Sequence, residues 1–358
     1  MRRVALLGAT GSIGIQAVEI VAAHPGLELC GLMSGSSSLD ALAAAHGVLH
    51  TQVGGDPTEL LERCEPDVVL NAIVGFAGVR ATLWALEHGV TLALANKESL
   101  VAAGSLAIDA AARGGGLLIP VDSEHSALFQ CLDGRDPATV HSLILTASGG
   151  PFRGRARDTL VDVSPDEALA HPTWRMGRKI SVDSATLANK GLELIEAHWL
   201  FGTPFDAIEV VVHPSSIVHG LVRFRDGAAL AHVGYPDMRV PISFALAYPD
   251  RAATAVPALD LAAGLTLSFE APDLEAFPLL PLAREAGGRG GTYPCAYNAA
   301  NEVAVAAFLD GKIGFLDIAS TIAETLAEVD GVPARDLTEL VAADAEARRI
   351  AARRHVAA

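Results

Sequence analysis

The segment Gly8-Ala-Thr-Gly-Ser-Ile-Gly14 decides the fold of the first part of the chain. The apolar residues 3–7 before it predict a strand, the run to about residue 23 predicts a helix, and residues 27–33 predict a second strand. Glycines at this junction let a pyrophosphate approach the helix N-terminus. We therefore predict dinucleotide binding, with a tight structural turn as the alternative. The predicted contacts in this loop are Thr10, Gly11, Ser12 and Ile13.

The stretch after the second predicted strand bears on the choice of cofactor. NAD enzymes usually place an acidic residue there, for the ribose 2′-hydroxyl. This chain has Ser34-Gly-Ser-Ser-Ser38 instead, with no acidic or basic side chain in the run. Because hydroxyls can hydrogen-bond a 2′-phosphate, the run favours NADP, and Gly35, Ser36 and Ser37 are the predicted contacts.

Strand and helix patterns continue to alternate through the next part of the chain. Strands are predicted at residues 67–73, 90–95 and 117–121, and helices at 79–87 and 99–113. This alternation indicates a doubly wound parallel sheet. Side chains at the carboxyl ends of such strands lie over the ligand crevice. Asn96, Lys97 and Glu98 are therefore candidates, with helix capping by Asn96 and Glu98 as the alternative.

Two carboxylates follow the fifth predicted strand. Asp122 and Glu124 would point the same way in extended chain. At ~4 Å they would repel by roughly 4 kcal/mol at an effective dielectric constant of 20. A hard cation would remove that repulsion, and oxygen ligands favour magnesium or manganese. The alternative is an acidic loop that spreads into water.

A candidate anion site follows the strand predicted at residues 142–146. Ser148 and the two glycines after it could form an anion-binding nest, although an ordinary turn fits equally well. His213 and His219 lie in a later β-rich region, where lone histidines are more often structural than catalytic.

Residues 171–199 combine a cationic loop with a polar helix. Residues 163–178 predict a lid, because Pro165, Pro172 and Gly177 interrupt regular structure around Trp174. The cations of this segment are Arg175, Arg178 and Lys179. The remainder predicts one helix, which Asp183 or Ser184 would cap.

The polar side chains of that helix suggest an anion site beside a carboxylate. Asn189 and Lys190 lie four and three positions before Glu193, so the three side chains meet on one face. A glycine inside the helix, Gly191, indicates that another group approaches the helix closely there, for example a ligand. The alternative is a solvated helix face.

Composition restricts the class of protein. With 358 residues the chain can form two or three domains, and a net charge of −16 argues against a nucleic-acid partner. No apolar run reaches the length of a membrane span. The four cysteines form no CxxC pair and suit reduced thiols, so we expect a cytoplasmic protein.

Six stretches together resemble the 1-deoxy-D-xylulose 5-phosphate reductoisomerase family. They follow the family's order over nearly the whole chain: Gly8–Gly14, Ala95–Val101, Val121–His125, Ala147–Phe152, 171–197 and His213–His219. The resemblance implies NADPH, a magnesium or manganese ion, a homodimer, and rearrangement and reduction to 2-C-methyl-D-erythritol 4-phosphate.

The resemblance also implies residue roles. Asp122, Glu124 and Glu193 would hold the metal. Ser148, Ser184, Asn189 and Lys190 would bind the substrate phosphate. Ser123 and Lys97 would line the reacting end, His171 and Trp174 would belong to the lid, and His219 would be a further active-site histidine. The predicted catalytic residues are Lys97, Glu124, His171 and His219.

The predicted fold class is α/β with three folded parts and a linker. We expect a Rossmann-like domain at 1–121, an α+β catalytic and dimerisation domain at 122–252, a linker at 253–277 and a C-terminal helical bundle at 278–358. The last part shows no catalytic pattern and predicts packing structure only. The stretch after Ser38 is short, and we expect it to lack a strand–helix unit that the family carries.

Two other functions remain open from the sequence. A metal-assisted NADP dehydrogenase of another hydroxy acid would use the carboxylates without the phosphate residues. A non-catalytic dinucleotide sensor would need the glycine loop alone. Both are weaker readings of the six stretches than a reductoisomerase.

Overall fold

The computed structural model describes residues 1–174 and 176–353, which form two compact units. Unit 1 comprises Met1–Ser99, Ser105–Gln130 and Asp237–Ala258. Unit 2 comprises the rest of the described chain. The α/β fold class predicted from the sequence is confirmed.

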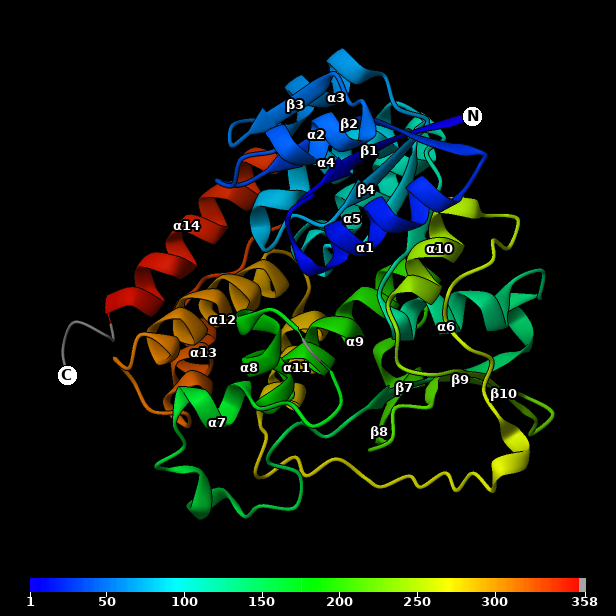
Figure 1. Cartoon of the computed structure of the whole chain (residues 1–358). Helices are drawn as coiled ribbons and strands as arrows, with labels where there is room; N and C mark the ends of the chain where they lie inside the picture. Colours follow the sequence, from blue (N-terminus) through cyan, green and yellow to red (C-terminus); the bar gives the residue numbers. More distant parts are fainter. Residues whose placement is uncertain (175, 354–358) are drawn as a thin grey trace. The chain divides into compact units, whose positions relative to one another are not determined.

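A six-stranded parallel sheet forms the centre of unit 1 (Figure 1), in the order β3-β2-β1-β4-β5-β6. Apart from the edge strand β3, the strands are mostly apolar and buried, as parallel strands covered on both faces are. Val4 and Leu6 of β1, for example, pair with Val68 and Leu70 of β4. The strand bounds are β1 Arg2–Leu7, β2 Leu27–Ser34, β3 His50–Val53, β4 Val68–Asn71, β5 Thr91–Leu94 and β6 Leu118–Pro120.

Seven helices of the described chain lie wholly or mostly in this unit. Helices α1 and α10 lie side by side, so a segment from much later in the sequence completes the core beside the glycine loop (Figure 1). Phe244 of α10 contacts Phe129 of α6 edge to face, at 6.1 Å between ring centroids. The bounds are α1 Ser12–Ala23, α2 Asp40–His46, α3 Pro57–Cys64, α4 Val79–Glu87, α5 Lys97–Gly114, α6 Ser123–Leu132 and α10 Arg239–Ala247.

The segment between β2 and β4 contains α2, β3 and α3. The expectation that it lacks a further strand–helix unit of the family stays a prediction. β3 is a four-residue edge strand with alternating exposure, in which Val53 is exposed. Asp56 caps α3 by accepting a hydrogen bond from the Thr58 amide at 3.0 Å.

Unit 2 contains a four-stranded mixed sheet in the order β10-β9-β7-β8 (Figure 1). β7 pairs in parallel with β8 and antiparallel with β9, and β10 forms an edge. The bounds are β7 Val140–Ala147, β8 Ile208–Val212, β9 Val218–Phe224 and β10 Ala229–Val233. These strands agree with the β-rich region expected from the sequence.

The helices of unit 2 include a bundle at the C-terminal end of the described chain. Tyr297 and Phe308 of α12 are fully buried, and Phe315 joins Phe308 to Phe152 through edge-to-face ring contacts. The bounds are α7 Pro165–Leu169, α8 Arg178–Ala185, α9 Ala188–Phe201, α11 Leu279–Arg289, α12 Tyr293–Leu309, α13 Asp317–Glu328 and α14 Leu337–Arg353.

The prediction of one helix after the loop was wrong. The chain forms α8 and α9, separated by Thr186 and Leu187, and Leu187 has a left-handed φ of 59°. Asp183 and Ser184 therefore lie inside the last turns of α8 and cap no helix. A local propensity argument could not place this break, because leucine rarely adopts that conformation without tertiary contacts.

The predicted lid is partly helical. Pro165 begins α7, where Ser164 and Glu167 form a capping box, so this proline starts regular structure rather than preventing it. The segment from Ala170 to Gly177 is irregular over its described residues. Arg175, one of the predicted lid cations, lies outside the described residues.

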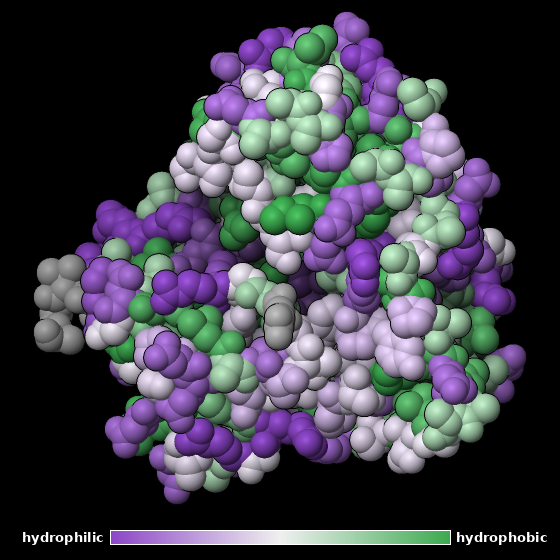
Figure 2. Space-filling model, in the orientation of Figure 1, coloured by the Kyte–Doolittle hydropathy of each residue, from purple (hydrophilic) through white to green (hydrophobic). Residues whose placement is uncertain are grey.

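The face in Figure 2 shows hydrophilic and hydrophobic side chains interspersed with one another. Among the described residues, no helix has both the length and the apolar character needed to cross a membrane.

Candidate functional site

The glycine loop of unit 1 has the backbone geometry that its sequence predicted. Gly8 has φ +86°, and a Cβ there would lie 2.5 Å from the carbonyl oxygen of Ala72. A Cβ at Gly14 would lie 2.3 Å from the carbonyl oxygen of Gly8, so α1 packs directly on the loop. Gly11 is the N-cap residue of α1, and Thr10, Gly11 and Ser12 are exposed. The first-turn amides of α1 can therefore receive a phosphate.

Some hydroxyls of the serine run at 34–38 form hydrogen bonds within the loop, and others are exposed. Ser34 donates to the carbonyl oxygen of Ser37 at 2.5 Å, and Ser38 donates to Asp40 at 2.9 Å. These bonds shape the loop. Gly35, Ser36 and Ser37 are exposed, so a ligand could reach them. Their role as cofactor contacts stays a prediction.

Asn96 caps the N-terminus of α5, which was the alternative to a role in the ligand crevice. Its Oδ1 accepts a hydrogen bond from the Ser99 amide at 3.0 Å, at the start of α5. Its Nδ2 donates to the carbonyl oxygens of Ile73 and Gly75 and to Glu98. The residue thus ties the loop after β4 to α5. A cofactor contact by Asn96 or Glu98 stays a prediction.

The extended conformation expected around Asp122 is wrong. Glu124 lies in the first turn of α6, and Asp122 Oδ1 accepts from the Glu124 and His125 amides at 3.1 and 3.3 Å. Asp122 therefore acts as a helix cap. Helix capping was not recognised because the acidic pattern was read as extended chain.

Asp122 also connects two buried basic side chains. Its Oδ2 lies 2.9 Å from the Lys97 Nζ, and its Oδ1 lies 3.0 Å from the His125 Nδ1. Ser123 donates to Glu124 at 2.5 Å. Unit 1 therefore presents two carboxylates, a lysine and a histidine together at the start of α6.

In unit 2, the hydroxyl of Ser148 lies at the centre of a second site. Its oxygen is 2.9 Å from His171 Nε2 and accepts the Gly150 amide at 3.2 Å. Gly149 and Gly150 have φ +85° and +66°, so they form the turn with two left-handed glycines. A Cβ at Gly150 would lie 2.8 Å from the Ser184 carbonyl oxygen, which brings α8 against this turn.

The hydrogen bonds of His171 indicate which ring nitrogen carries the proton. Its Nδ1 accepts the amides of Thr173 and Trp174 at 3.1 and 2.9 Å. Burial lowers the pKa of His171, which favours the neutral ring. The neutral ring with an acceptor at Nδ1 carries its proton on Nε2, so Nε2–H donates to Ser148. Ser148 is then left with its own proton to donate to a ligand.

The beginning of α9 joins a buried lysine to a buried glutamate. Lys190 and Glu193 are 3% and 1% exposed and form an ion pair. Asn189 donates to the other carboxylate oxygen of Glu193. The predicted meeting of these three side chains is confirmed. Ser184, on the preceding helix α8, and Asn189 are half-buried.

Asn301 is a contact that the sequence analysis missed. Its Nδ2 donates to the fully buried Asp183 at 2.8 Å, and Lys179 donates to the other Asp183 oxygen at 2.7 Å. The C-terminal helices therefore support α8, beyond the packing role expected for them. The available signal was an asparagine inside the apolar helix α12, which offers no hint of its partner.

Close packing of α9 against a neighbouring helix explains the glycine at position 191, and no ligand is needed to explain it. A Cβ at this position would lie 2.6 Å from the Cβ of Ala283 and 3.1 Å from the hydroxyl of Tyr297. The glycine lets α9 approach α11. The expected close approach is therefore real, but the neighbour is a helix of the same unit.

His219 lies on β9, between the edge strand β10 and β7. It is 6% exposed, and burial, followed by the neighbouring His232, lowers its pKa to about 4. The ring is therefore neutral near pH 7. Nearby, the Thr146 hydroxyl donates to the Val218 carbonyl oxygen, so His219 follows a residue tied to the end of β7.

Trp174 is half-buried, and its backbone amide is held by His171. This bond links the indole-bearing segment directly to the Ser148 site. The lid function of the segment stays a prediction.

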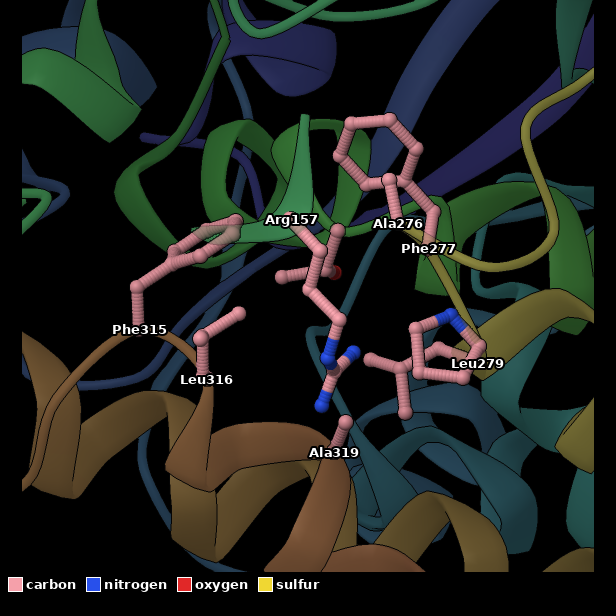
Figure 3. A pocket seen from close by; sticks show the side chains of 9 residues that line it. Arg157, Ala276, Phe277, Leu279, Phe315, Leu316 and Ala319 are labelled. Atoms are coloured by element: carbon pink, nitrogen blue, oxygen red, sulfur yellow. The ribbon is translucent and has the colours of Figure 1, made fainter. Parts of the chain in front are cut away.

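A small hollow elsewhere in unit 2 contains none of the predicted site residues. Figure 3 shows the Arg157 side chain among Phe277, Leu279 and Phe315. Its lining is mostly apolar, and Arg157 is its charged side chain.

The three predicted metal ligands are all carboxylates, which suits a hard divalent cation such as magnesium or manganese. Asp122 and Glu124 belong to unit 1, and Glu193 belongs to unit 2. Lys97 and Lys190, beside Asp122 and Glu193, offset part of the negative charge.

The glycine loop before α1 in unit 1 has the geometry of a dinucleotide-binding loop. The two-glycine turn and the buried Lys190 of unit 2 could hold an anion. These are the features of a dinucleotide-dependent enzyme with an anionic substrate. Family models agree in detail. DXP reductoisomerase models match residues 4–53 and 38–104, and its C-terminal domain models match 118–201 and 233–350.

Individual relatives give the same result. A 1-deoxy-D-xylulose 5-phosphate reductoisomerase of Leifsonia xyli is 53% identical, covering 97% of this chain and 96% of its own. The solved enzyme from Zymomonas mobilis in complex with NADPH is 42% identical, with a TM-score of 0.90 and complete coverage of both chains. A second solved structure, of a DOX-P reductoisomerase in complex with NADPH, fosmidomycin and magnesium, is 39% identical, with a TM-score of 0.91. The match covers 99% of this chain and 98% of that one. The chain belongs to the 1-deoxy-D-xylulose 5-phosphate reductoisomerase family.

Proposed function

We propose that this protein converts 1-deoxy-D-xylulose 5-phosphate into 2-C-methyl-D-erythritol 4-phosphate, using NADPH and a divalent cation, for isoprenoid precursor synthesis. The observation that carries the proposal is the 53% identity with a curated reductoisomerase over 97% of this chain. The activity requires a grip on the substrate phosphate, polarisation of a hydroxyketone and delivery of a hydride.

The substrate phosphate would bind Ser148, Ser184, Asn189 and Lys190. The Ser148 oxygen accepts from His171 and the Gly150 amide, so its own proton is directed to a further acceptor. Lys190 adds a positive charge, which strengthens hydrogen bonds to a dianion. The amides at the start of α9 would contribute as other helix N-termini do.

Asp122, Glu124 and Glu193 would hold the divalent cation. When bound, magnesium or manganese would polarise the ketone and adjacent hydroxyl oxygens as a Lewis acid. Lys97 would hold Asp122 in place, since its Nζ lies 2.9 Å from that carboxylate. Ser123 would orient Glu124 in the same way and would line the reacting end of the substrate.

NADPH would bind at the glycine loop through Thr10, Gly11, Ser12 and Ile13. Gly35, Ser36 and Ser37 would contact the 2′-phosphate, and Asn96 and Glu98 would be further cofactor contacts. The reduced nicotinamide would transfer hydride to the aldehyde formed by the rearrangement.

His171 and Trp174 would close over the substrate, and His219 would line the site as a neutral histidine. Closure would exclude water from the reactive aldehyde. Lys97, Glu124, His171 and His219 are the residues we assign to catalysis.

We also propose a cytoplasmic homodimer. The edge strand β10 exposes Leu230 and Val233, with Tyr235 just beyond it, at 37%, 43% and 39%. An apolar sheet edge of this kind favours pairing with a second copy. The division into domains at 1–121, 122–252, 253–277 and 278–358 stays part of this proposal.

One assay tests the proposed function. Purified protein is mixed with NADPH, 1-deoxy-D-xylulose 5-phosphate and magnesium or manganese, and NADPH oxidation is followed. We expect turnover that stops after chelation and returns when metal is restored. Failure to oxidise NADPH with this substrate, or turnover with an unphosphorylated hydroxy acid instead, would contradict the proposal.

A further inference from the structure

Two polar side chains from distant parts of the sequence meet inside unit 2. Asn301 of α12 and Asp183 of α8 are fully buried, and the Asn301 Nδ2 donates to the Asp183 Oδ1 at 2.8 Å. The Lys179 Nζ donates to the other oxygen, Oδ2, at 2.7 Å. Helices α8 and α12 lie side by side (Figure 1). Because a carboxylate only accepts hydrogen bonds, Asp183 depends on donors from other residues, and the C-terminal bundle supplies one of them.

Asp183 lies close to the junction of two helices that carry proposed phosphate ligands. Its backbone carbonyl oxygen accepts from the Thr186 hydroxyl at 3.2 Å, and the oxygen of that hydroxyl accepts from the Ala188 amide at 3.3 Å. Ala188 is the first residue of α9. This chain of hydrogen bonds therefore connects Asp183 to the start of the helix on which Asn189 and Lys190 lie.

The next residue along α8 contacts the turn that contains Ser148. A Cβ at Gly150 would lie 2.8 Å from the Ser184 carbonyl oxygen, so this turn packs closely against the end of α8. A displacement of Asp183 would pass to Ser184 through one peptide bond and then to the turn through this contact. Close-packed segments of this kind transmit such a displacement.

We propose that Asn301 is a positioning residue of the phosphate site, which acts through Asp183 to fix Ser184 and the start of α9. The inference rests on the proposed function, because it takes Ser184, Asn189 and Lys190 as ligands of the substrate phosphate. Asn301 itself would not touch the substrate. Without its amide, a buried carboxylate oxygen of Asp183 loses a donor, and the end of α8 shifts until that oxygen finds another.

Steady-state kinetics of the full-length protein with 1-deoxy-D-xylulose 5-phosphate provides the test. Asn301→Ala should raise the KM for this substrate by roughly 10-fold and lower kcat by at most about 2-fold, because phosphate binding is affected more than the chemical step. The dissociation constant for NADPH should not change, since the glycine loop lies in unit 1. An unchanged KM in folded Asn301→Ala protein would overturn the inference.

A second buried asparagine of α12 is the matched control. Asn298 is also fully buried, and it donates to Glu302 of its own helix at 2.9 Å. Asn298→Ala should lower the melting temperature, as Asn301→Ala should, but it should leave the KM unchanged. An equal rise in KM for both variants would show that any loss of stability in the bundle has this effect, and the positioning role would fail.

Exchanging the two groups provides a rescue experiment. Asp183→Asn alone cannot accept from both Asn301 and Lys179, and Asn301→Asp alone places two carboxylates face to face. The double variant again has one amide facing one carboxylate, and the amide oxygen at position 183 can still accept from Lys179. We expect each single change to raise the KM and the double change to bring it back towards the unmodified value. A double variant whose KM shows the two single effects multiplied would contradict the inference.

Binding of inorganic phosphate, measured by calorimetry, separates this inference from the proposed reaction because it requires no turnover. Phosphate affinity should fall by about 10-fold in Asn301→Ala. If the unmodified protein turns over and the variant keeps its KM and phosphate affinity, the positioning role alone is wrong. If the unmodified protein shows no turnover, the proposed function is wrong, and phosphate affinity still decides the positioning role.

Circular dichroism melting establishes that each variant is folded. Should Asn301→Ala fail to fold, Asn301→Ser takes its place, because it keeps a hydroxyl donor in a smaller side chain. The KM should then rise by a smaller factor, and an unchanged KM and phosphate affinity in this variant would equally overturn the inference.

Discussion

His171 places its Nε2 atom 2.9 Å from the hydroxyl oxygen of Ser148. The backbone amides of Thr173 and Trp174 hold the opposite side of the ring. The same histidine therefore orients the proposed phosphate ligand and anchors the proposed lid. This arrangement predicts that phosphate binding and lid position are coupled.

Ser148→Ala should raise the KM for the substrate by roughly 10- to 100-fold, about 1.4–2.7 kcal/mol, because one hydrogen bond to a charged phosphate is lost. The dissociation constant for NADPH should not change, since the glycine loop lies in unit 1. Steady-state kinetics and NADPH fluorescence titration measure the two effects. Ser320→Ala, a serine of α13 bonded to its own helix, is the control. An unchanged KM would remove Ser148 from the phosphate site.

Glu193→Gln should abolish turnover and leave NADPH binding intact, because a neutral amide oxygen binds a hard divalent cation more weakly than a carboxylate does. The change also leaves Lys190 without its carboxylate partner, so thermal melting is measured in parallel. Glu285→Gln, which alters an exposed ion pair with Arg289, is the matched control. Full activity of the unmodified protein after exhaustive chelation would disprove a metal-dependent reaction.

The serine loop predicts a limited preference for NADPH over NADH. A serine hydroxyl can donate one hydrogen bond to the charged 2′-phosphate, whereas an arginine would add a positive charge and a bidentate pair of hydrogen bonds. Ser37→Arg should therefore increase the ratio of kcat/KM for NADPH to that for NADH by about 10-fold. Ser320→Arg adds the same charge to unit 2 as a control. An equal or higher kcat/KM with NADH in the unmodified protein would show that the loop has been misread.

Trp174→Ala should lower kcat/KM by roughly 10- to 100-fold, or about 1.4–2.7 kcal/mol, if the indole closes over bound substrate. Melting without ligand should barely change. Tryptophan fluorescence should shift when substrate or a metal-chelating phosphonate is added, and the variant should lose that shift. Trp84→Phe, which changes a tryptophan stacked on His88 in unit 1, should keep it. A variant that melts several degrees lower with normal kinetics would identify Trp174 as a core residue.

The buried His219 should make the stability of the fold sensitive to acid. Its folded-state pKa of about 4 lies below the ordinary value of 6.5, because burial disfavours the charged ring and His232 adds repulsion. The unfolded chain therefore binds more protons between these values, and the free energy of unfolding falls as pH drops from 6.5 towards 4. The loss attributable to His219 is on the order of 3 kcal/mol.

Urea unfolding across this pH range checks the prediction. His219→Gln should show a shallower pH dependence, whereas His46→Gln, at an exposed position, should match the unmodified protein. His171 contributes in the same direction, because burial also lowers its pKa. Identical pH dependence of the unmodified protein and His219→Gln would contradict the assignment.

The sequence by itself determined the parallel sheet, the glycine turn and the family. Those features depend on local patterns: apolar runs of strand length, glycines between a strand and a helix, and short ordered motifs. The pairing of Asn189 and Lys190 with Glu193 also followed from helical spacing alone. Such neighbours lie within one turn of each other, so spacing determines their contact.

Only the tertiary structure decided which conformations and partners the other residues adopt. Asp122 caps a helix where extended chain was expected, and the left-handed Leu187 divides one expected helix into two. Gly191 is required by Ala283, and Asp183 finds Asn301 across 118 positions of sequence. A linear pattern records which groups need a partner, but folding brings distant segments together and thereby selects the partner.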